Sequence, residues 1–207
     1  MDNFVIVQEL VHSIGRTKGK NGLTAIKIDL EKAYDKIEWS FICEMLLRFK
    51  FPSKLIDLIM SCISSVSSTL LFNGGCLESF WPSRGIRQGD PLSPYLFIMC
   101  MEFLSHLIER KCENKSWTPI KTSRNGLPFS HLFFADDLVL FACANLENCQ
   151  AIKDVLSEFC TRSGQTVSAA KSRVYFSPNV DPDQREVFSD IFGFTQTSNL
   201  GKYLGFP

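Results

Sequence analysis

The sequence lacks an excess of either charge, because its 207 residues carry 22 basic and 22 acidic side chains. Such neutrality does not indicate a nucleic-acid partner, so any such binding has to depend on a local patch. The longest apolar run, Tyr95 to Phe103, is interrupted by Glu102 and is too short to cross a bilayer. The start, Met1 to Asn3, lacks the basic region of a signal peptide. We therefore expect neither a membrane segment nor a secretory leader.

The sequence also has few metal-binding patterns of the zinc type. Only three His are present, and none of the eight Cys forms a CxxC pair, which argues against a zinc site. An even number of Cys is compatible with disulfides, but these residues are scattered and most fall on apolar faces of predicted elements. Buried reduced thiols are the better interpretation. We expect an intracellular protein, in the nucleus or the cytoplasm.

Apolar and aromatic residues are plentiful. Hydrophobic residues make up 45% of the chain and charged residues 21%, and there are 18 Phe. These proportions are typical of a folded globular protein and not of a disordered one. The length suits one sizeable domain, or one domain with a subdomain, and the core is expected to be aromatic.

Two adjacent carboxylates, Asp136 and Asp137, lie between the apolar runs Leu132 to Phe134 and Leu138 to Phe141. These short aromatic and branched runs predict two buried strands joined by a tight turn that carries both Asp. Two like charges side by side repel each other and resist desolvation unless a cation lies between them. A divalent metal is one explanation and an ordinary polar turn is the other, since Asp favours turns. This stretch alone leaves both open.

A third carboxylate comes from another predicted strand, at residues 24–30. Ile26 and Ile28 share one face of this strand, and Asp29 projects from the other face near its end. If the strands are neighbours in one sheet, the three carboxylates converge. Hard oxygen ligands of this kind suit Mg²⁺, and two such ions about 4 Å apart support phosphoryl transfer.

The remaining pattern alternates helices with short strands. Helical spacing predicts helices over residues 3–14, 39–49 and from a cap at Ser53, and a long helix with Ser93 as its N-cap. Further helices are expected from a cap at Asn145 to Gly164, and around residues 187–192. A hairpin is expected at 68–72 and 77–81, a strand at 174–176, and irregular structure at 113–130. This order predicts an α+β fold without repeats.

The loop of residues 84–94 precedes the long helix and holds Arg84 and Arg87 with two Gly and two Pro. Cations and a helix N-terminus equip such a loop to hold an anion such as a nucleotide phosphate. The alternative is a proline-rich turn that only starts a helix.

Five runs of the sequence resemble, in order and separation, motifs A to E of reverse transcriptases: AIKIDLEKAYDKIEW, RGIRQGDPLSPYLF, FFADDLVLF, SGQTVSAAKS and YLGFP. Phe134-Ala135 before the Asp pair narrows the resemblance to non-LTR (LINE-type) retrotransposons, and the opening DNFVIVQELVH resembles a fingers segment of that family. The resemblance implies a polymerase right-hand palm with part of the fingers and without a thumb. Residues 1–23 would be a fingers segment, 24–38 palm motif A, 39–83 fingers-side helices and a hairpin, and 84–207 palm motifs B to E.

The resemblance also implies metal-binding and catalytic roles. Asp29 and Asp136 would be the principal ligands of two Mg²⁺ ions, for which Mn²⁺ can substitute, with the Leu30 carbonyl and Asp137 in support. Lys171 would protonate the pyrophosphate leaving group, although an exposed lysine of no special role has the same pattern.

Other residues would contact the substrates. Tyr34 would exclude the 2′-hydroxyl of a ribonucleotide and so select dNTPs, whereas without the family it would be assigned to the core. The resemblance places Gln88 and Gly89 at the incoming nucleotide. Arg87 would lie beside them or, like Arg84, contact the template or the fold. Tyr203, Leu204 and Gly205 would form the primer grip.

The implied function is RNA-directed DNA synthesis on an RNA template from a DNA primer and dNTPs. Ser168 stands where the family usually has Asn, which alters motif D. Basic fingers residues, a thumb and an upstream endonuclease would belong to a longer polyprotein, so the fragment alone is expected to be weakly active or inactive. A non-enzymatic retroelement remnant with a palm-like fold, able to bind nucleic acid, is the alternative. An RNA-templated RNA polymerase is a third, against which Tyr34 argues.

Overall fold

The computed structural model describes residues 2–121, 126–198 and 200. Its centre is a five-stranded sheet in the order β6-β7-β1-β8-β9. The strands are β1 (Leu23–Asp29), β6 (His131–Phe134), β7 (Asp137–Cys143), β8 (Arg173–Phe176) and β9 (Thr195–Gln196). All neighbours are antiparallel except β8 and β9. The two predicted strands that carry the carboxylates, β1 and β7, are therefore direct neighbours.

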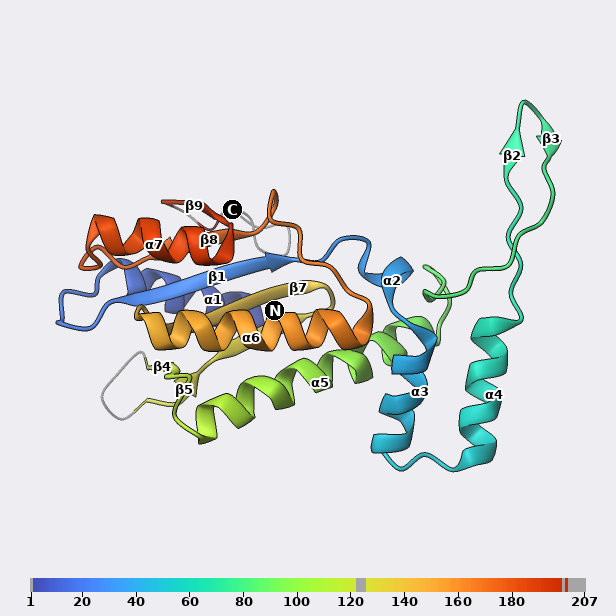
Figure 1. Ribbon diagram of the computed structural model, residues 1–207, viewed down its shortest axis with the longest axis horizontal. Coiled ribbons are helices and arrows are strands. Elements are labelled where there is room, and N and C mark those ends of the chain that lie inside the picture. The colour runs from blue at the N-terminus through green and yellow to red at the C-terminus, as the bar shows by residue number, and fades with distance from the viewer. Residues whose placement is uncertain (1, 122–125, 199, 201–207) are drawn as a thin grey trace.

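Helices cover both faces of this sheet (Figure 1). The helices of the fold are α1 (Asp2–Gly15), α2 (Ala33–Lys36), α3 (Trp39–Arg48), α4 (Ser53–Ser64), α5 (Ser93–Glu113), α6 (Leu146–Ser163) and α7 (Pro182–Phe192), of which α2, α3 and α4 lie beyond the end of the sheet (Figure 1). Figure 1 shows α6 and α5 in front of the sheet and α1 behind it. The arrangement confirms the predicted α+β class.

The alternation of side chains along the strands produces two cores. Ile26 and Ile28 of β1 pack with Leu138 of β7 in the larger core, to which α3, α5, α6 and α7 contribute. Ala25 of β1 and Phe141 of β7 point to the opposite face and pack against α1. Asp29 follows the same alternation and projects on the α1 face, where the apolar packing ends.

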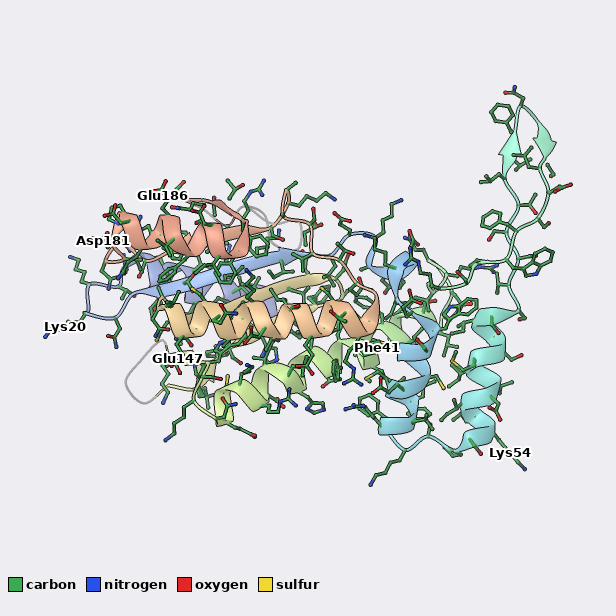
Figure 2. All side chains as sticks on the ribbon, in the orientation of Figure 1. Lys20, Phe41, Lys54, Glu147, Asp181 and Glu186 are labelled. Atoms are coloured by element: carbon green, nitrogen blue, oxygen red, sulfur yellow. The ribbon has the colours of Figure 1, made fainter. Side chains whose placement is uncertain are left out.

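The larger core is aromatic, as its composition predicts. Phe41 of α3 meets Phe103 of α5 and Phe159 of α6 edge to face, with ring centroids 5.5 and 6.3 Å apart. Figure 2 labels Phe41 where α3 meets the end of α6. Trp117 is fully buried, and its indole Nε1–H donates to the Phe141 carbonyl at 2.9 Å. These rings fix α3, α5 and α6 relative to the sheet.

A hairpin formed by β2 (Leu71–Phe72) and β3 (Gly75–Cys76) projects away from the sheet, beyond α4 (Figure 1). A hairpin was predicted here, but its second strand begins at Gly75 and not at Leu77. An isolated bridge joins Ser68 and Phe80 nearer its base. Asn73 and Gly74 form the two-residue turn, with φ of 48° and 81°. Large apolar side chains stay exposed along it: Leu70, Leu71, Phe72, Leu77, Phe80 and Trp81.

Two predicted helix caps are wrong and two are confirmed. Ser53 and Ser93 are the first helical residues, and the capping positions belong to Pro52 and Leu92, without side-chain capping bonds. Before α5, Asp90 Oδ1 accepts from the Leu92 N–H at 2.8 Å and shapes the turn instead. Asn145 accepts from the Asn148 N–H at 2.8 Å, and Gly164 ends α6 at φ 76°, both as predicted.

Three short strands were not predicted. β4 (Ile120–Lys121) pairs with β5 (Pro128–Phe129) within the segment 113–130, which was expected to be irregular, and β9 joins β8 later in the chain. Strands of two residues are too short to show a period of two in the sequence. The helix α7 begins at Pro182, earlier than expected, because Asp181 accepts from the Asp183 N–H and caps it.

The thiols are less uniformly buried than expected. All eight Cys are free, but only Cys100 and Cys149 are buried, while Cys62 and Cys76 are exposed. Within residues 2–121, 126–198 and 200, no helix is both long and apolar enough to span a membrane.

Candidate active site

The carboxylates meet where β1 and β7 end. Asp29 and Asp137 are cross-strand partners at the last position of the ladder, and directly opposite residues in a sheet project on the same face. Phe134 pairs with Asp137 across the β6–β7 hairpin, so the turn is formed by Ala135 and Asp136. The prediction that both Asp lie in the turn is therefore wrong for Asp137, which is the first residue of β7. Asp136 lies beside the pair on the turn.

The electrostatics of the cluster reflect this crowding. Burial raises the pKa of Asp137, the negative charges of Asp136 and Asp29 raise it further, and Lys27 opposes them. Asp29 Oδ1 is buried without a hydrogen-bond partner, and the Lys171 Nζ lies 3.8 Å away from it. An orphaned carboxylate oxygen among like charges is costly unless a cation approaches.

The donor chemistry of the cluster fits a hard divalent cation, because Asp29 Oδ1 accepts no hydrogen bond and lies next to the carboxylate of Asp137. The residues are not gathered into a finished coordination shell: in the part of the chain that the structure describes, no group of three or more His, Cys, Asp or Glu could hold a metal ion. Leu30 is buried and forms an isolated bridge with Val167. A ligand role for its carbonyl stays a prediction.

The loop after α6 lies along the end of β1. The Ser168 N–H donates to the Asp29 carbonyl at 2.8 Å, and the fully buried Ser172 Oγ accepts from the Asp29 N–H at 3.1 Å. Ser168 thus contacts Asp29 through its backbone N–H, and an Asn at this position would make the same bond. The replacement of the family's usual Asn by Ser168 therefore leaves this contact intact. Sequence reasoning missed Ser172, and only its place beside Lys171 hinted at it.

A cleft of about 470 Å³ opens beside Asp136. It is lined by Tyr34, Gln88, Gly89, Asp90, Pro91, Pro94 and Asp136. The Tyr34 ring stacks on Phe97, with centroids 4.9 Å apart and planes 13° from parallel. Burial raises the pKa of the Tyr34 phenol, and the negative charge of Asp136 adds to it. The structure therefore brings Tyr34, Gln88 and Gly89, which sequence reasoning assigned to one nucleotide, together with Asp136, which it assigned to the metal ions.

Arg87 does not line this cleft. It lines a neighbouring cavity of about 640 Å³ between α4, the base of the hairpin and the 84–94 loop, and Gln88 belongs to both cavities. Arg84 lines the same cavity and forms an ion pair with Glu38 at 3.4 Å. The predicted nucleotide contact of Arg87 thus has no support from the cleft lining. Tyr203, Leu204 and Gly205 lie outside the described residues.

Comparison with known proteins agrees with this geometry. A family model described as reverse transcriptase (RNA-dependent DNA polymerase) matches residues 4–207. The chain belongs to the reverse transcriptase family.

Relatives of this reverse transcriptase domain include retrotransposon polyproteins. A Pol polyprotein of a type-1 R2 element from Popillia japonica is 27% identical over 81% of this chain and 26% of its own length. The Pol polyprotein of the R2DM element from Drosophila melanogaster is 30% identical over 70% of this chain and 13% of its own length. The predicted likeness to non-LTR elements is thereby confirmed, and the chain spans only a minor part of these polyproteins.

The fold is that of a polymerase palm. Telomerase from Candida tropicalis, solved with a fragment of telomeric RNA, superimposes with a TM-score of 0.62 at 17% identity, over 85% of this chain and 29% of that one. The apo form truncated from its C-terminal domain gives a TM-score of 0.60. The predicted palm is confirmed by these neighbours. The reverse transcriptase family generally uses divalent metals, in keeping with the carboxylate cluster.

Proposed function

We propose that this domain catalyses RNA-directed DNA synthesis, in which the 3′-hydroxyl of a DNA primer attacks the α-phosphate of a dNTP on an RNA template. The observation that carries the proposal is the pairing of Asp29 with Asp137, next to Asp136, at the mouth of the cleft lined by Tyr34 and Gln88. Pyrophosphate leaves as the new phosphodiester bond forms.

Two Mg²⁺ ions, or Mn²⁺ in their place, would be held by Asp29, Asp136 and Asp137 with the Leu30 carbonyl, and when bound would activate the hydroxyl and neutralise phosphate charge. Lys171 is well suited to give a proton to the departing pyrophosphate. Its side chain is 71% exposed, and its Nζ lies 3.8 Å from Asp29 Oδ1. A mobile cation at this distance can follow the leaving group.

The cleft would select the sugar and hold the base. The Tyr34 ring has its face against Phe97 and cannot move in that direction, so a 2′-hydroxyl on the incoming nucleotide would collide with it. Gln88 and Gly89 would line the same nucleotide. Arg87 would contact the template from the neighbouring cavity, and Tyr203, Leu204 and Gly205 would form the primer grip.

The proposal assigns residues 1–23 to the fingers, 24–38 to motif A, 39–83 to fingers-side elements and 84–207 to motifs B to E. The length of the relatives supports a longer polyprotein. In this proposal the further parts are the rest of the fingers, a thumb and an endonuclease. We expect the 207 residues alone to extend a primer weakly or not at all.

The test is primer extension by a protein completed with fingers and thumb. The change Asp136→Asn removes a charge from the cluster and should reduce synthesis to background, whereas Asp57→Asn on the exposed surface of α4 should leave it unchanged. Equal synthesis by Asp136→Asn and the unaltered protein would refute the assignment. No synthesis by the unaltered protein would favour the non-enzymatic remnant.

A further test separates DNA from RNA synthesis. The unaltered protein should prefer dNTPs over NTPs, and Tyr34→Val should weaken that preference, because the ring that meets the 2′-hydroxyl is removed. A preference for NTPs in the unaltered protein would assign the domain to RNA synthesis instead.

A further inference from the structure

The segment Ser163 to Ser172, here called the clasp, runs along the second part of motif A, residues 29–38. The Ser168 N–H donates to the Asp29 carbonyl at 2.8 Å, the Glu31 N–H donates to the Thr166 carbonyl at 2.9 Å, and the Glu38 N–H donates to the Ser163 carbonyl at 2.9 Å. These backbone bonds join the segment to both ends of the stretch that holds Asp29 and Tyr34.

One side chain of the clasp reaches the middle of that stretch. Gln165 is only 4% exposed, and its Nε2 donates to the Ala33 carbonyl at 2.7 Å. This carbonyl belongs to the peptide that joins Ala33 to Tyr34. Gln165 Oε1 is buried without a hydrogen-bond partner. Burial of an amide oxygen without a hydrogen-bond donor is costly. The side chain nevertheless stays buried, where the bond from its Nε2 to the Ala33 carbonyl is made.

The element that receives this bond has little stability of its own. Tyr34 lies in α2, a four-residue helix that follows Lys32 in a left-handed conformation, at φ 48°, without a side-chain cap. Such short helices are not stable alone and depend on contacts with other parts of the fold. The conformation of α2, and with it the direction of the Tyr34 ring, therefore depends on contacts from other segments of the fold.

Three contacts hold Tyr34. Its ring stacks on Phe97, its carbonyl accepts from the Ile86 N–H at 2.8 Å, and the preceding peptide accepts from Gln165. The first two come from α5 and the loop before it, whereas the third comes from the clasp. Gln165 is thus the side chain through which the segment carrying Lys171 reaches the cleft.

We propose that Gln165 is a positioning residue that orients Tyr34 and thereby sets the discrimination between deoxyribonucleotides and ribonucleotides. The inference rests on the proposed function of the cleft. The clasp thereby has a second role besides carrying Lys171. Loss of the buried Gln165 amide should change the sugar selectivity while the three carboxylates stay in place.

The test variant is Gln165→Met, which keeps the length and volume of the side chain but cannot donate to Ala33. Asn148→Leu is the matched control: Asn148 is also buried, its Oδ1 accepts from the Thr118 N–H at 2.5 Å, and it lies at the start of α6, near the other end of β7 from the carboxylates. Both variants lose a buried amide, but only Gln165→Met should affect Tyr34.

The first measurement is hydrogen exchange in the 207-residue chain without nucleotide. The Ile86 amide, which donates to Tyr34, should exchange about tenfold faster in Gln165→Met than in Asn148→Leu, as expected for the loss of one neutral hydrogen bond beside it. Equal exchange at Ile86 in the two variants overturns the inference, whether or not the protein makes DNA.

The second measurement is the ratio of dNTP to NTP incorporation by the completed protein. Gln165→Met should lower this ratio several-fold, and Asn148→Leu should leave it unchanged. An unaltered ratio in Gln165→Met overturns the inference. If the unaltered protein makes no DNA, the proposed function has failed, and the exchange at Ile86 alone decides whether Gln165 positions Tyr34.

Discussion

Gly164 and Gly193 form a natural pair for measuring how tightly the clasp approaches motif A. Each follows the last residue of a helix, α6 or α7, in the left-handed conformation, with φ of 76° and 69°. A Cβ on Gly164 would lie 2.8 Å from the Lys36 carbonyl oxygen and 2.6 Å from Glu38 Cγ, whereas a Cβ on Gly193 would meet nothing within 4 Å. The two glycines differ only in their surroundings.

Alanine at either position pays the same conformational cost, about 1 kcal/mol for a left-handed residue with a Cβ. At Gly164 the backbone of Lys36 must also move, and overpacking of this kind costs roughly 1–3 kcal/mol more. We expect Gly193→Ala to lower the free energy of unfolding by about 1 kcal/mol and Gly164→Ala by about 2–4 kcal/mol. The difference between the variants measures the contact between the clasp and motif A.

Equilibrium unfolding in urea, followed by circular dichroism, provides the assay. The midpoint should fall in both variants with an unchanged slope, because neither substitution alters the surface exposed on unfolding. Equal losses in the two variants would refute the close approach of Gly164 to Lys36. A larger loss in Gly193→Ala would contradict the whole comparison.

Three further predictions follow from burial and capping. Burial lowers the pKa of His131 below its value of about 6.5 in the unfolded chain. As the pH drops below about 6.5, the unfolded chain therefore binds the proton before the folded protein does, and the free energy of unfolding falls. His131→Gln should reduce this fall, which is measured by comparing urea midpoints at about pH 7.5 and about pH 5.5. Asn145→Ala removes the N-cap of α6 and should cost about 1–2 kcal/mol in the same assay, with no loss contradicting the cap. Iodoacetamide should modify the exposed Cys62 and Cys76 in the native protein. Burial raises the thiol pKa of Cys100 and Cys149 to about 12, so these two should react only after unfolding. Mass spectrometry of the native and the unfolded protein after treatment detects which thiols are modified.

The local chemistry of the site could be predicted from sequence because successive side chains of a strand point to opposite faces of the sheet. The opposite placement of Ile28 and Asp29 on β1 follows from a period of two, and the apolar runs around Asp136 define a hairpin. The turn was assigned one residue too many, because the sequence does not tell whether Asp137 still pairs with Phe134. That pairing depends on the register, which the turn geometry sets.

The contacts between distant segments could not be predicted in the same way. The bond from Gln165 to Ala33 joins residues 132 positions apart, and no periodic pattern encodes such a contact. Arg87 shows a related difficulty, since its charge is suited to a phosphate partner, but the loop places it along the cavity next to the Tyr34 cleft. Residue type indicates what a side chain can do, while the direction of a loop depends on the whole fold.

The chain contains two hairpins whose turns are of equal length, and they differ in how much change they can accept. Ala135 and Asp136 join β6 to β7 at the carboxylate cluster, so an inserted residue there would shift Asp136 from Asp29. Asn73 and Gly74 stand at the exposed tip of the β2–β3 hairpin, far from the sheet (Figure 1). Exposed loop tips are where insertions succeed. A fluorescent label or an affinity tag introduced between Asn73 and Gly74 would thus report on the protein without disturbing the carboxylate cluster.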